Sequence, residues 1–100
     1  MINIKKNILI AHRGNLEGPI PEKENHPDYL LKSVALGYAV ETDIWRLNGG
    51  WVLGHDLPQY EIGEDVLAML GNAGFLWSHI KNIEALQELV SDNKYRCWNY

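Results

Sequence analysis

Short apolar runs alternate with segments of helical periodicity along this chain, and this alternation leaves few folds open to it. We expect strands over residues 8–11, 38–44, 51–54, 75–80 and 95–98, and helices that begin at residues 27, 64 and 83. Asn48-Gly49 is a tight-turn pair, which predicts a hairpin between residues 44–47 and 51–54. Strands that alternate with helices form a parallel sheet covered by helices, so the sequence predicts an α/β fold.

Capping residues mark the ends of the expected helices. Either Asn25 or His26 is suited to cap the first helix, which has a proline at its first position. Gly37 is expected to end this helix, and Gly71 to end the second over residues 64–70. Asn82 is expected to cap the third, over residues 83–91.

Charge and cysteine content exclude several classes of protein. The 100 residues carry 9 basic and 13 acidic side chains, a formal net charge of −4, and no cluster of lysine or arginine. Affinity for phosphate backbones needs concentrated positive charge, so nucleic-acid binding is not expected. The single cysteine, Cys97, cannot form an internal disulfide. The apolar stretch behind Lys5-Lys6 has four residues, too few for a signal peptide or a membrane span. We therefore expect a cytoplasmic protein without stable membrane insertion; the alternative is an exported protein given without its leader.

Polar residues gather where the predicted strands end. They are His12 and Arg13, Glu41 and Asp43, His55 and Asp56, and His79 and Lys81. The carboxyl ends of parallel strands meet at one edge of a sheet, where α/β proteins bind ligands. We therefore expect one site, built from several strand ends.

The carboxylates of Glu41 and Asp43 are two residues apart on a predicted strand, so both point to one face. Two carboxylates that converge repel each other unless a cation or a proton joins them, and a divalent cation prefers such oxygen ligands. The alternative is a solvated strand face, on which polar residues commonly alternate.

The basic residues and histidines suit phosphate chemistry. The guanidinium of Arg13 matches a phosphate oxyanion with two parallel hydrogen bonds. His12 and His55 supply two groups of the kind that acid/base catalysis needs. The alternative for each is a polar residue of a surface loop or turn, and Lys81 taken alone would be a solvated lysine.

Taken in order, these motifs resemble the glycerophosphodiester phosphodiesterase family. That family has His-Arg-Gly, then Pro-Glu-Asn-Thr, Glu-x-Asp, a glycine-rich turn leading to His-Asp, and Glu-x-Lys. The corresponding residues here are His12-Arg13-Gly14, Glu24-Asn25-His26, Glu41-Thr42-Asp43, Gly54-His55-Asp56 and His79-Ile80-Lys81. Order and spacing agree from residue 8 to about residue 85.

The resemblance implies a metal-dependent phosphodiesterase of lipid metabolism that hydrolyses glycerophosphodiesters, or a related small phosphodiester, to glycerol 3-phosphate and an alcohol. The implied nucleophile is either water or a neighbouring hydroxyl of the substrate. The implied roles are acid/base catalysis for His12 and His55, phosphate binding for Arg13 and Lys81, metal ligation for Glu41 and Asp43, and support of the site for Glu24.

One departure from the family pattern concerns the metal. His79 stands where the family has glutamate as a third metal ligand. Imidazole removes one negative charge and suits transition metals better than Ca²⁺ or Mg²⁺. We expect one divalent cation (Mg²⁺, Ca²⁺ or Mn²⁺, with Zn²⁺ if His79 ligates), and the alternative is that His79 has no metal role. This change also motivates a second hypothesis, a catalytically degenerate relative that binds a phosphorylated ligand or a metal without turnover.

The other departure concerns length. The family fold is a (β/α)8 barrel of about 250 residues, so a chain of 100 residues covers roughly three to four of its parallel β/α units. We expect one domain or fragment over residues 1–100, an incomplete TIM-barrel-like phosphodiesterase fold. Open parallel edges are a liability, so either the chain is a fragment or it assembles as a homo-oligomer or with a completing chain.

Overall fold

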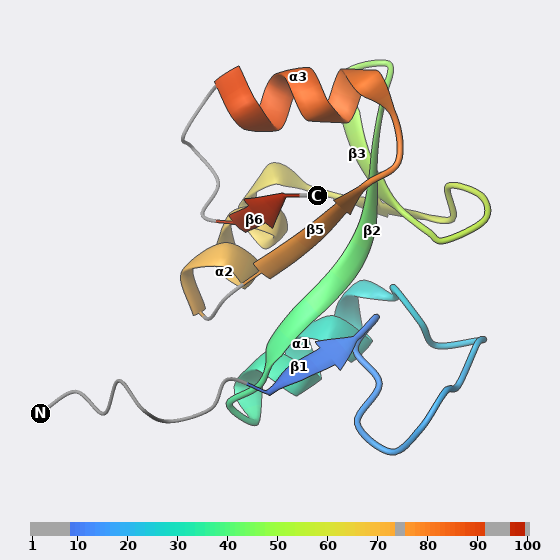
Figure 1. Cartoon of the computed structure of the whole chain (residues 1–100), viewed down its shortest axis with the longest axis vertical. Helices are drawn as coiled ribbons and strands as arrows, with labels where there is room; N and C mark the ends of the chain where they lie inside the picture. The colour runs from blue at the N-terminus through green and yellow to red at the C-terminus, as the bar shows by residue number, and fades with distance from the viewer. Residues whose placement is uncertain (1–8, 74–75, 92–96, 100) are drawn as a thin grey trace, which may run out of the picture.

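The computed structural model describes residues 9–73, 76–91 and 97–99 of the chain (Figure 1). In chain order the elements are β1 (Ile10–His12), α1 (Pro27–Ala35), β2 (Ala39–Leu47), β3 (Gly50–Leu53), β4 (Tyr60–Ile62), α2 (Glu64–Ala73), β5 (Leu76–Ile80), α3 (Ile83–Ser91) and β6 (Cys97–Asn99). Within these described ranges, none of the helices is long and apolar enough to cross a membrane.

The strands form one curled sheet in the order β4-β3-β2-β5-β6, and β1 pairs with β2 as well. The β1–β2, β2–β5 and β5–β6 pairings are parallel, whereas β2–β3 and β3–β4 are antiparallel. The α/β class predicted from the sequence is confirmed. The sheet is mixed, because β3 and β4 add antiparallel strands to it, so the parallel β/α units of a barrel stay a prediction.

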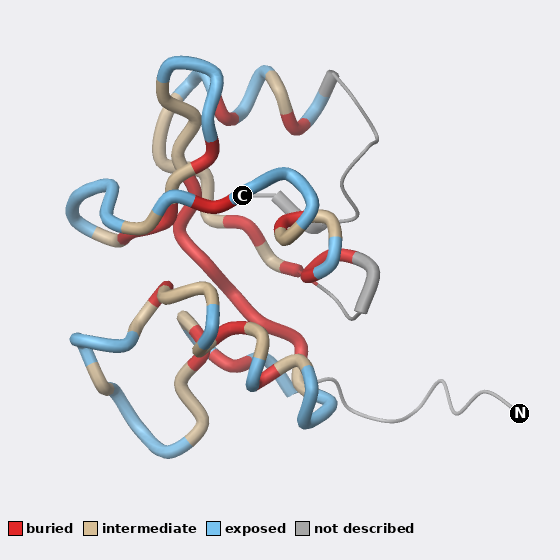
Figure 2. The backbone as a smooth tube through the Cα atoms, turned by 180° about the vertical axis from the view of Figure 1, so that it is seen from behind, coloured by how far each residue is buried: buried red, intermediate tan, exposed pale blue. Residues whose placement is uncertain are grey.

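β2 crosses the middle of the molecule, and its residues 39–44 are all buried (Figure 2). Side chains alternate between the two faces of a strand. Val40 and Ile44 are fully buried on the face that joins the apolar core with leucines from all three helices. Burial of one such side chain contributes about 1.5–3 kcal/mol. Glu41 and Asp43 therefore point to the opposite face, away from this core.

Both sides of β2 are occupied by partners. On one side β5 pairs with residues 40–44. On the other side β1 pairs with residues 39–41 and β3 with residues 44–47. Residues 42 and 43 consequently lie between two different pairing partners on that side.

Most of the predicted turns and caps are confirmed. The hairpin turns at Asn48 (φ 50°) and Gly49 (φ 79°), the left-handed conformations that a two-residue turn requires. Of the two candidate caps, it is His26 whose Nδ1 accepts a hydrogen bond from the Asp28 N–H (3.1 Å) at the start of α1. Gly37 follows the end of α1 with φ 94°. Asn82 Oδ1 accepts from the Ala85 N–H (3.1 Å) at the start of α3.

One prediction about an element was wrong, and one strand was missed. α2 continues to Ala73 instead of ending at Gly71, which is buried inside the helix. A glycine in a helix costs about 0.5–1 kcal/mol relative to alanine, less than the packing of this helix supplies. β4 was not expected at all, since three residues are too few to show a strand periodicity. The predicted strand positions 8, 75, 95 and 96 lie outside the described residues.

Candidate functional site

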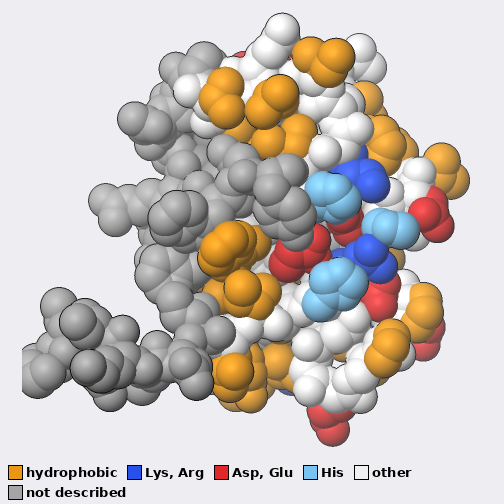
Figure 3. Space-filling model, viewed as in Figure 1, with side chains coloured by type: hydrophobic (Ala, Val, Ile, Leu, Met, Phe, Trp, Pro, Cys, Tyr) orange, Lys and Arg blue, Asp and Glu red, His pale blue; other side chains and the backbone are white. Residues whose placement is uncertain are grey.

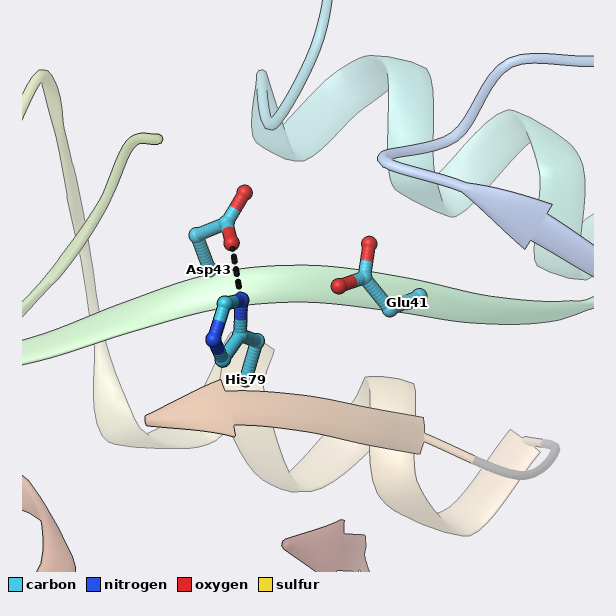
Figure 4. A group of neighbouring side chains, drawn as sticks. All are labelled: Glu41, Asp43 and His79. Atoms are coloured by element: carbon cyan, nitrogen blue, oxygen red, sulfur yellow. Dashed lines mark hydrogen bonds and ion pairs between the residues drawn. The ribbon is translucent and has the colours of Figure 1, made fainter. Parts of the chain in front are cut away.

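Three side chains that commonly bind metals converge on the face of the sheet opposite the core. Asp43 of β2 lies in register with His79 of β5, and Glu41 is two residues before Asp43. One ligand atom from each of the three lies within 4.8 Å of the others. Figure 4 shows them extending from two neighbouring strands toward one another. Glu41 is 6% exposed and Asp43 is fully buried, so the convergence expected from the spacing of the two carboxylates is present.

The carboxylate of Asp43 contacts partners at both oxygens. Its Oδ1 is 3.0 Å from His79 Nδ1. Its Oδ2 is 3.1 Å from the Nε of Arg13 and accepts a hydrogen bond from Asn25 Nδ2 at 2.9 Å. A buried charge is tolerated when it is paired and hydrogen-bonded in this way.

Arg13 reaches Asp43 because the chain turns sharply after β1. The Arg13 N–H donates to the Glu41 carbonyl at 2.8 Å and extends the parallel ladder by one bond. Arg13 then adopts φ 55° and Gly14 φ 89°. A Cβ at Gly14 would lie 2.9 Å from a ring carbon of Tyr29, so this position needs glycine on both grounds.

Glu24 lies against the other side of the Arg13 guanidinium. Its Oε1 is 3.2 Å from Arg13 Nη1, and its Oε2 accepts a hydrogen bond from Asn15 Nδ2 at 2.9 Å. The hydrogen bond from Asn15, followed by the hydrogen bond and charge of Arg13, lowers the pKa of Glu24 below its ordinary value, although partial burial opposes this. Glu24 thus stabilises the guanidinium from the side that Asp43 does not contact.

The lowered pKa of Glu24 predicts a pH-dependent effect of Glu24→Gln. A carboxyl whose pKa is lower in the folded state stabilises the fold above its unfolded pKa and loses that contribution as the pH falls through the folded pKa. We therefore expect Glu24→Gln to lower the free energy of unfolding at pH 7, and this difference from the unsubstituted chain to shrink as the pH falls below about 4. Urea unfolding at several pH values measures it, with Glu22→Gln at an exposed neighbour as control. If the difference in the free energy of unfolding between Glu24→Gln and the unsubstituted chain stays constant with pH, the pKa of Glu24 is not lowered by folding.

The two predicted catalytic histidines occupy different surroundings. The His12 side chain is 62% exposed, and its Nε2 is 3.6 Å from Glu41 Oε1. His55 follows β3, and its Nδ1 is 2.9 Å from Oδ1 of the exposed Asp56. His55 also lines a cleft of about 540 Å³ together with Arg13, Pro21, Glu24, Asn25, Asp56, Leu57 and Gln59. Figure 3 shows histidine, basic and acidic side chains gathered on this face of the molecule.

Gly54 explains how the loop after β3 brings His55 to the cleft. A Cβ at Gly54 would overlap the carbonyl oxygen of Leu57 and lie 2.9 Å from the Gln59 amide nitrogen, so the chain turns more tightly here than any other residue allows. The Gly54 carbonyl accepts a hydrogen bond from Trp45 Nε1 at 2.7 Å. This bond attaches the turn to β2.

Lys81 follows β5. Its N–H donates to the Ile44 carbonyl at 2.9 Å and continues the β2–β5 ladder. By strand alternation Lys81 lies on the same face as His79, and it is half-buried. Of the two predicted phosphate ligands, Arg13 therefore contacts the candidate metal ligand Asp43, and Lys81 shares the face of the sheet on which His79 lies.

Sequence reasoning missed the part that Asn25 plays: it placed this residue in the motif Glu24-Asn25-His26 but gave it no role beyond that of a candidate helix cap. Asn25 is 1% exposed and adopts φ 66°. Its side chain contacts Thr42 and Asp43 of β2, whereas its neighbour caps the helix. The available signal was its position directly after Glu24, but only the fold shows what it touches.

The charges of the described site residues favour a bound cation. The site holds three carboxylates, those of Glu24, Glu41 and Asp43, against the two cationic side chains of Arg13 and Lys81, and Glu24 and Asp43 contact the Arg13 guanidinium. A divalent cation, or protons on the neighbouring imidazoles, would balance this excess of negative charge. Two carboxylates and one imidazole are a donor set that divalent cations accept, so the residues present fit the predicted metal.

Comparisons with protein-family models, with curated proteins and with solved structures found no match to this chain. What the protein does therefore has to follow from the geometry of this site.

Proposed function

We propose that the chain is a metal-dependent phosphodiesterase that hydrolyses glycerophosphodiesters, or a related small phosphodiester, to glycerol 3-phosphate and an alcohol. One juxtaposition carries the proposal: the ligand set of Glu41, Asp43 and His79 lies directly against Arg13, which lines a cleft shared with His55. The resemblance of the motifs to the glycerophosphodiester phosphodiesterase family supports it. A barrel-like arrangement of β/α units, completed by a second copy or another chain, belongs to the same proposal.

In this proposal the charged residues of the site have different roles in binding a phosphodiester. Glu41, Asp43 and His79 would hold the cation, and a bound divalent cation offsets phosphate charge and lowers the pKa of a coordinated hydroxyl or water. Arginine carries five N–H donors, and Asp43 and Glu24 contact only its Nε and Nη1, so donors remain for a phosphate oxygen. Lys81 supplies a second positive charge on the same face.

The two histidines perform the proton transfers in this proposal. One of them removes the proton from the attacking oxygen, and the other protonates the leaving alkoxide. The exposed imidazole of His12 lies on the Glu41 side of the ligand set, and His55 lines the cleft next to Arg13. The side chain of each histidine is partly exposed, 62% for His12 and 43% for His55.

One observation favours a second candidate function, the binding of a metal or a phosphorylated ligand without turnover. Both oxygens of Asp43 already contact cationic or hydrogen-bonding groups, and His79 is the partner of Oδ1. An ion pair between Arg13 and Asp43 stabilises the site without any reaction. In this second candidate function the site residues bind a metal or a phosphorylated ligand, and none of them acts in catalysis.

Release of glycerol 3-phosphate from glycerophosphoethanolamine tests the proposal. The purified chain is assayed with Mg²⁺, Ca²⁺, Mn²⁺ and Zn²⁺, and each assay is repeated with excess chelator. Turnover that depends on a metal and disappears with chelator is expected. Turnover that persists in chelator would overturn the metal-dependent mechanism, whereas metal binding without turnover for any cation would establish the second candidate.

A further inference from the structure

We infer that Asn25 is a positioning residue of the candidate metal site, which holds Asp43 so that a single carboxylate oxygen, Oδ1, would ligate a bound cation. The inference rests on the metal site of the proposed function and adds to it a residue that acts through the carboxylate of Asp43. Asn25 lies in the loop between Arg13 and α1, far along the chain from both β2 and β5.

The side chain of Asn25 fits between two strands that pair with the same side of β2. β1 pairs with β2 up to Glu41, and β3 begins to pair at Ile44. Just past β3 the Gly54 N–H donates to the Asp43 carbonyl at 3.0 Å, whereas the Asp43 N–H bonds to Asn25 and to neither strand. Asn25 Oδ1 accepts hydrogen bonds from the Asp43 N–H at 3.0 Å and from Thr42 Oγ1 at 2.7 Å. The amide thus provides the partner for the Asp43 N–H, which neither β1 nor β3 provides.

The other end of the same amide binds the metal-ligand carboxylate. Asn25 Nδ2 donates to Asp43 Oδ2 at 2.9 Å, and Arg13 Nε is 3.1 Å from the same oxygen. With Oδ2 held by these two groups, Oδ1 is the oxygen directed toward His79, the third candidate ligand. One amide therefore sets both the backbone and the side-chain orientation of Asp43.

The backbone of Asn25 connects its contact with Asp43 to Arg13, the proposed phosphate-binding residue. Its N–H donates to the Arg13 carbonyl at 3.1 Å, and its φ of 66° is a left-handed conformation that asparagine tolerates better than most residues. Asn25 consequently fixes the position of the candidate metal ligand Asp43 relative to the backbone of Arg13. Partners that orient metal ligands in this way typically change metal affinity by about 10- to 100-fold when they are removed.

The test compares Mn²⁺ affinity with metal-free stability. Asn25→Gly removes the amide and keeps the left-handed backbone, and Asn25→Ser shortens the side chain so that it cannot reach Asp43 Oδ2. Thr42→Val is the matched control, because it removes a hydrogen bond to the same amide and leaves Asp43 its contacts. Mn²⁺ dissociation constants are measured by calorimetry, and thermal unfolding is measured in chelator.

We expect both Asn25 variants to bind Mn²⁺ at least about tenfold more weakly than the unsubstituted chain. Thr42→Val should bind Mn²⁺ within about twofold of the unsubstituted chain, even if its metal-free unfolding temperature falls as much as that of the Asn25 variants. Mn²⁺ affinity that follows metal-free stability across all three variants would reduce Asn25 to a structural role and overturn the inference. An unsubstituted chain that binds no Mn²⁺ would overturn it as well. If the unsubstituted chain binds Mn²⁺ but shows no turnover, the proposed phosphodiesterase activity is overturned. The Mn²⁺ affinities of the variants then still support or overturn the role of Asn25.

Discussion

Replacing His12 by alanine is expected to lower phosphodiester turnover by about 100- to 10,000-fold, the usual contribution of a positioned general acid or base. The fold should not change, because the His12 side chain is 62% exposed and its removal leaves no buried cavity. Metal affinity should change little, since Nε2 is 3.6 Å from Glu41 Oε1 and the three candidate ligands remain in place. The measurement is kcat and KM with the best cation, beside thermal unfolding and Mn²⁺ binding.

A second histidine of the chain provides the control for this prediction. His26 lies outside the proposed machinery, packs against the Tyr60 ring in a tilted arrangement with the ring centroids 4.9 Å apart, and caps α1 through Nδ1. His26→Asn keeps a side-chain acceptor at the cap, so it should keep full turnover and stability. If His12→Ala also kept full turnover, neither acid nor base catalysis would belong to His12. If it lost turnover together with Mn²⁺ binding, His12 would act on the metal site instead.

The parts of the fold that were predictable are those that depend on local sequence. The hairpin turn at Asn48-Gly49 and the caps of α1 and α3 follow from residues whose backbone preferences are strong. The end of α2 was not predictable in this way, because Gly71 is buried and packing outweighs its local preference. β4 forms only because β3 offers it a pairing edge, which no local signal reports.

The candidate site was likewise predictable in part. Strand alternation placed Glu41 and Asp43 on one face, and the order of the strands placed His79 near them. The pairing of Arg13 with Asp43 could not be foreseen, because it depends on the left-handed turn after β1. Arg13 was expected as a phosphate ligand alone, and its two carboxylate partners show that it also balances charge within the site.

The second large effect is expected at His79, where His79→Glu should reverse the preference of the site among cations. The unsubstituted chain, with two carboxylates and an imidazole, should bind Mn²⁺ and Zn²⁺ more tightly than Mg²⁺ or Ca²⁺. A third carboxylate offers the hard oxygen ligands that Mg²⁺ and Ca²⁺ prefer, so their affinities should rise by about tenfold or more while Zn²⁺ loses its nitrogen ligand. Calorimetric titration of each cation into both chains measures the change.

Metal-free stability gives an independent check on this prediction. In the unsubstituted chain His79 Nδ1 is 3.0 Å from Asp43 Oδ1, whereas His79→Glu puts a third carboxylate against two that are already buried. Repulsion among the three should lower the unfolding temperature in chelator, and added Ca²⁺ should raise it again by more than in the unsubstituted chain. His79→Gln has the same size as the glutamate without its charge, so it should show neither the repulsion nor the gain in Ca²⁺ affinity.

The outcome at His79 also separates the two candidate functions. If His79→Glu binds Mg²⁺ or Ca²⁺ and raises turnover with them, the catalytic groups are intact and the histidine has only changed which metal serves them. If the variant binds these cations tightly and still turns over nothing, the absence of activity has another cause than the side chain at position 79, and the second candidate function, binding without turnover, is favoured. An identical order of cation affinities in both chains would show that the side chain at position 79 does not ligate. The metal site would then consist of Glu41 and Asp43 without it.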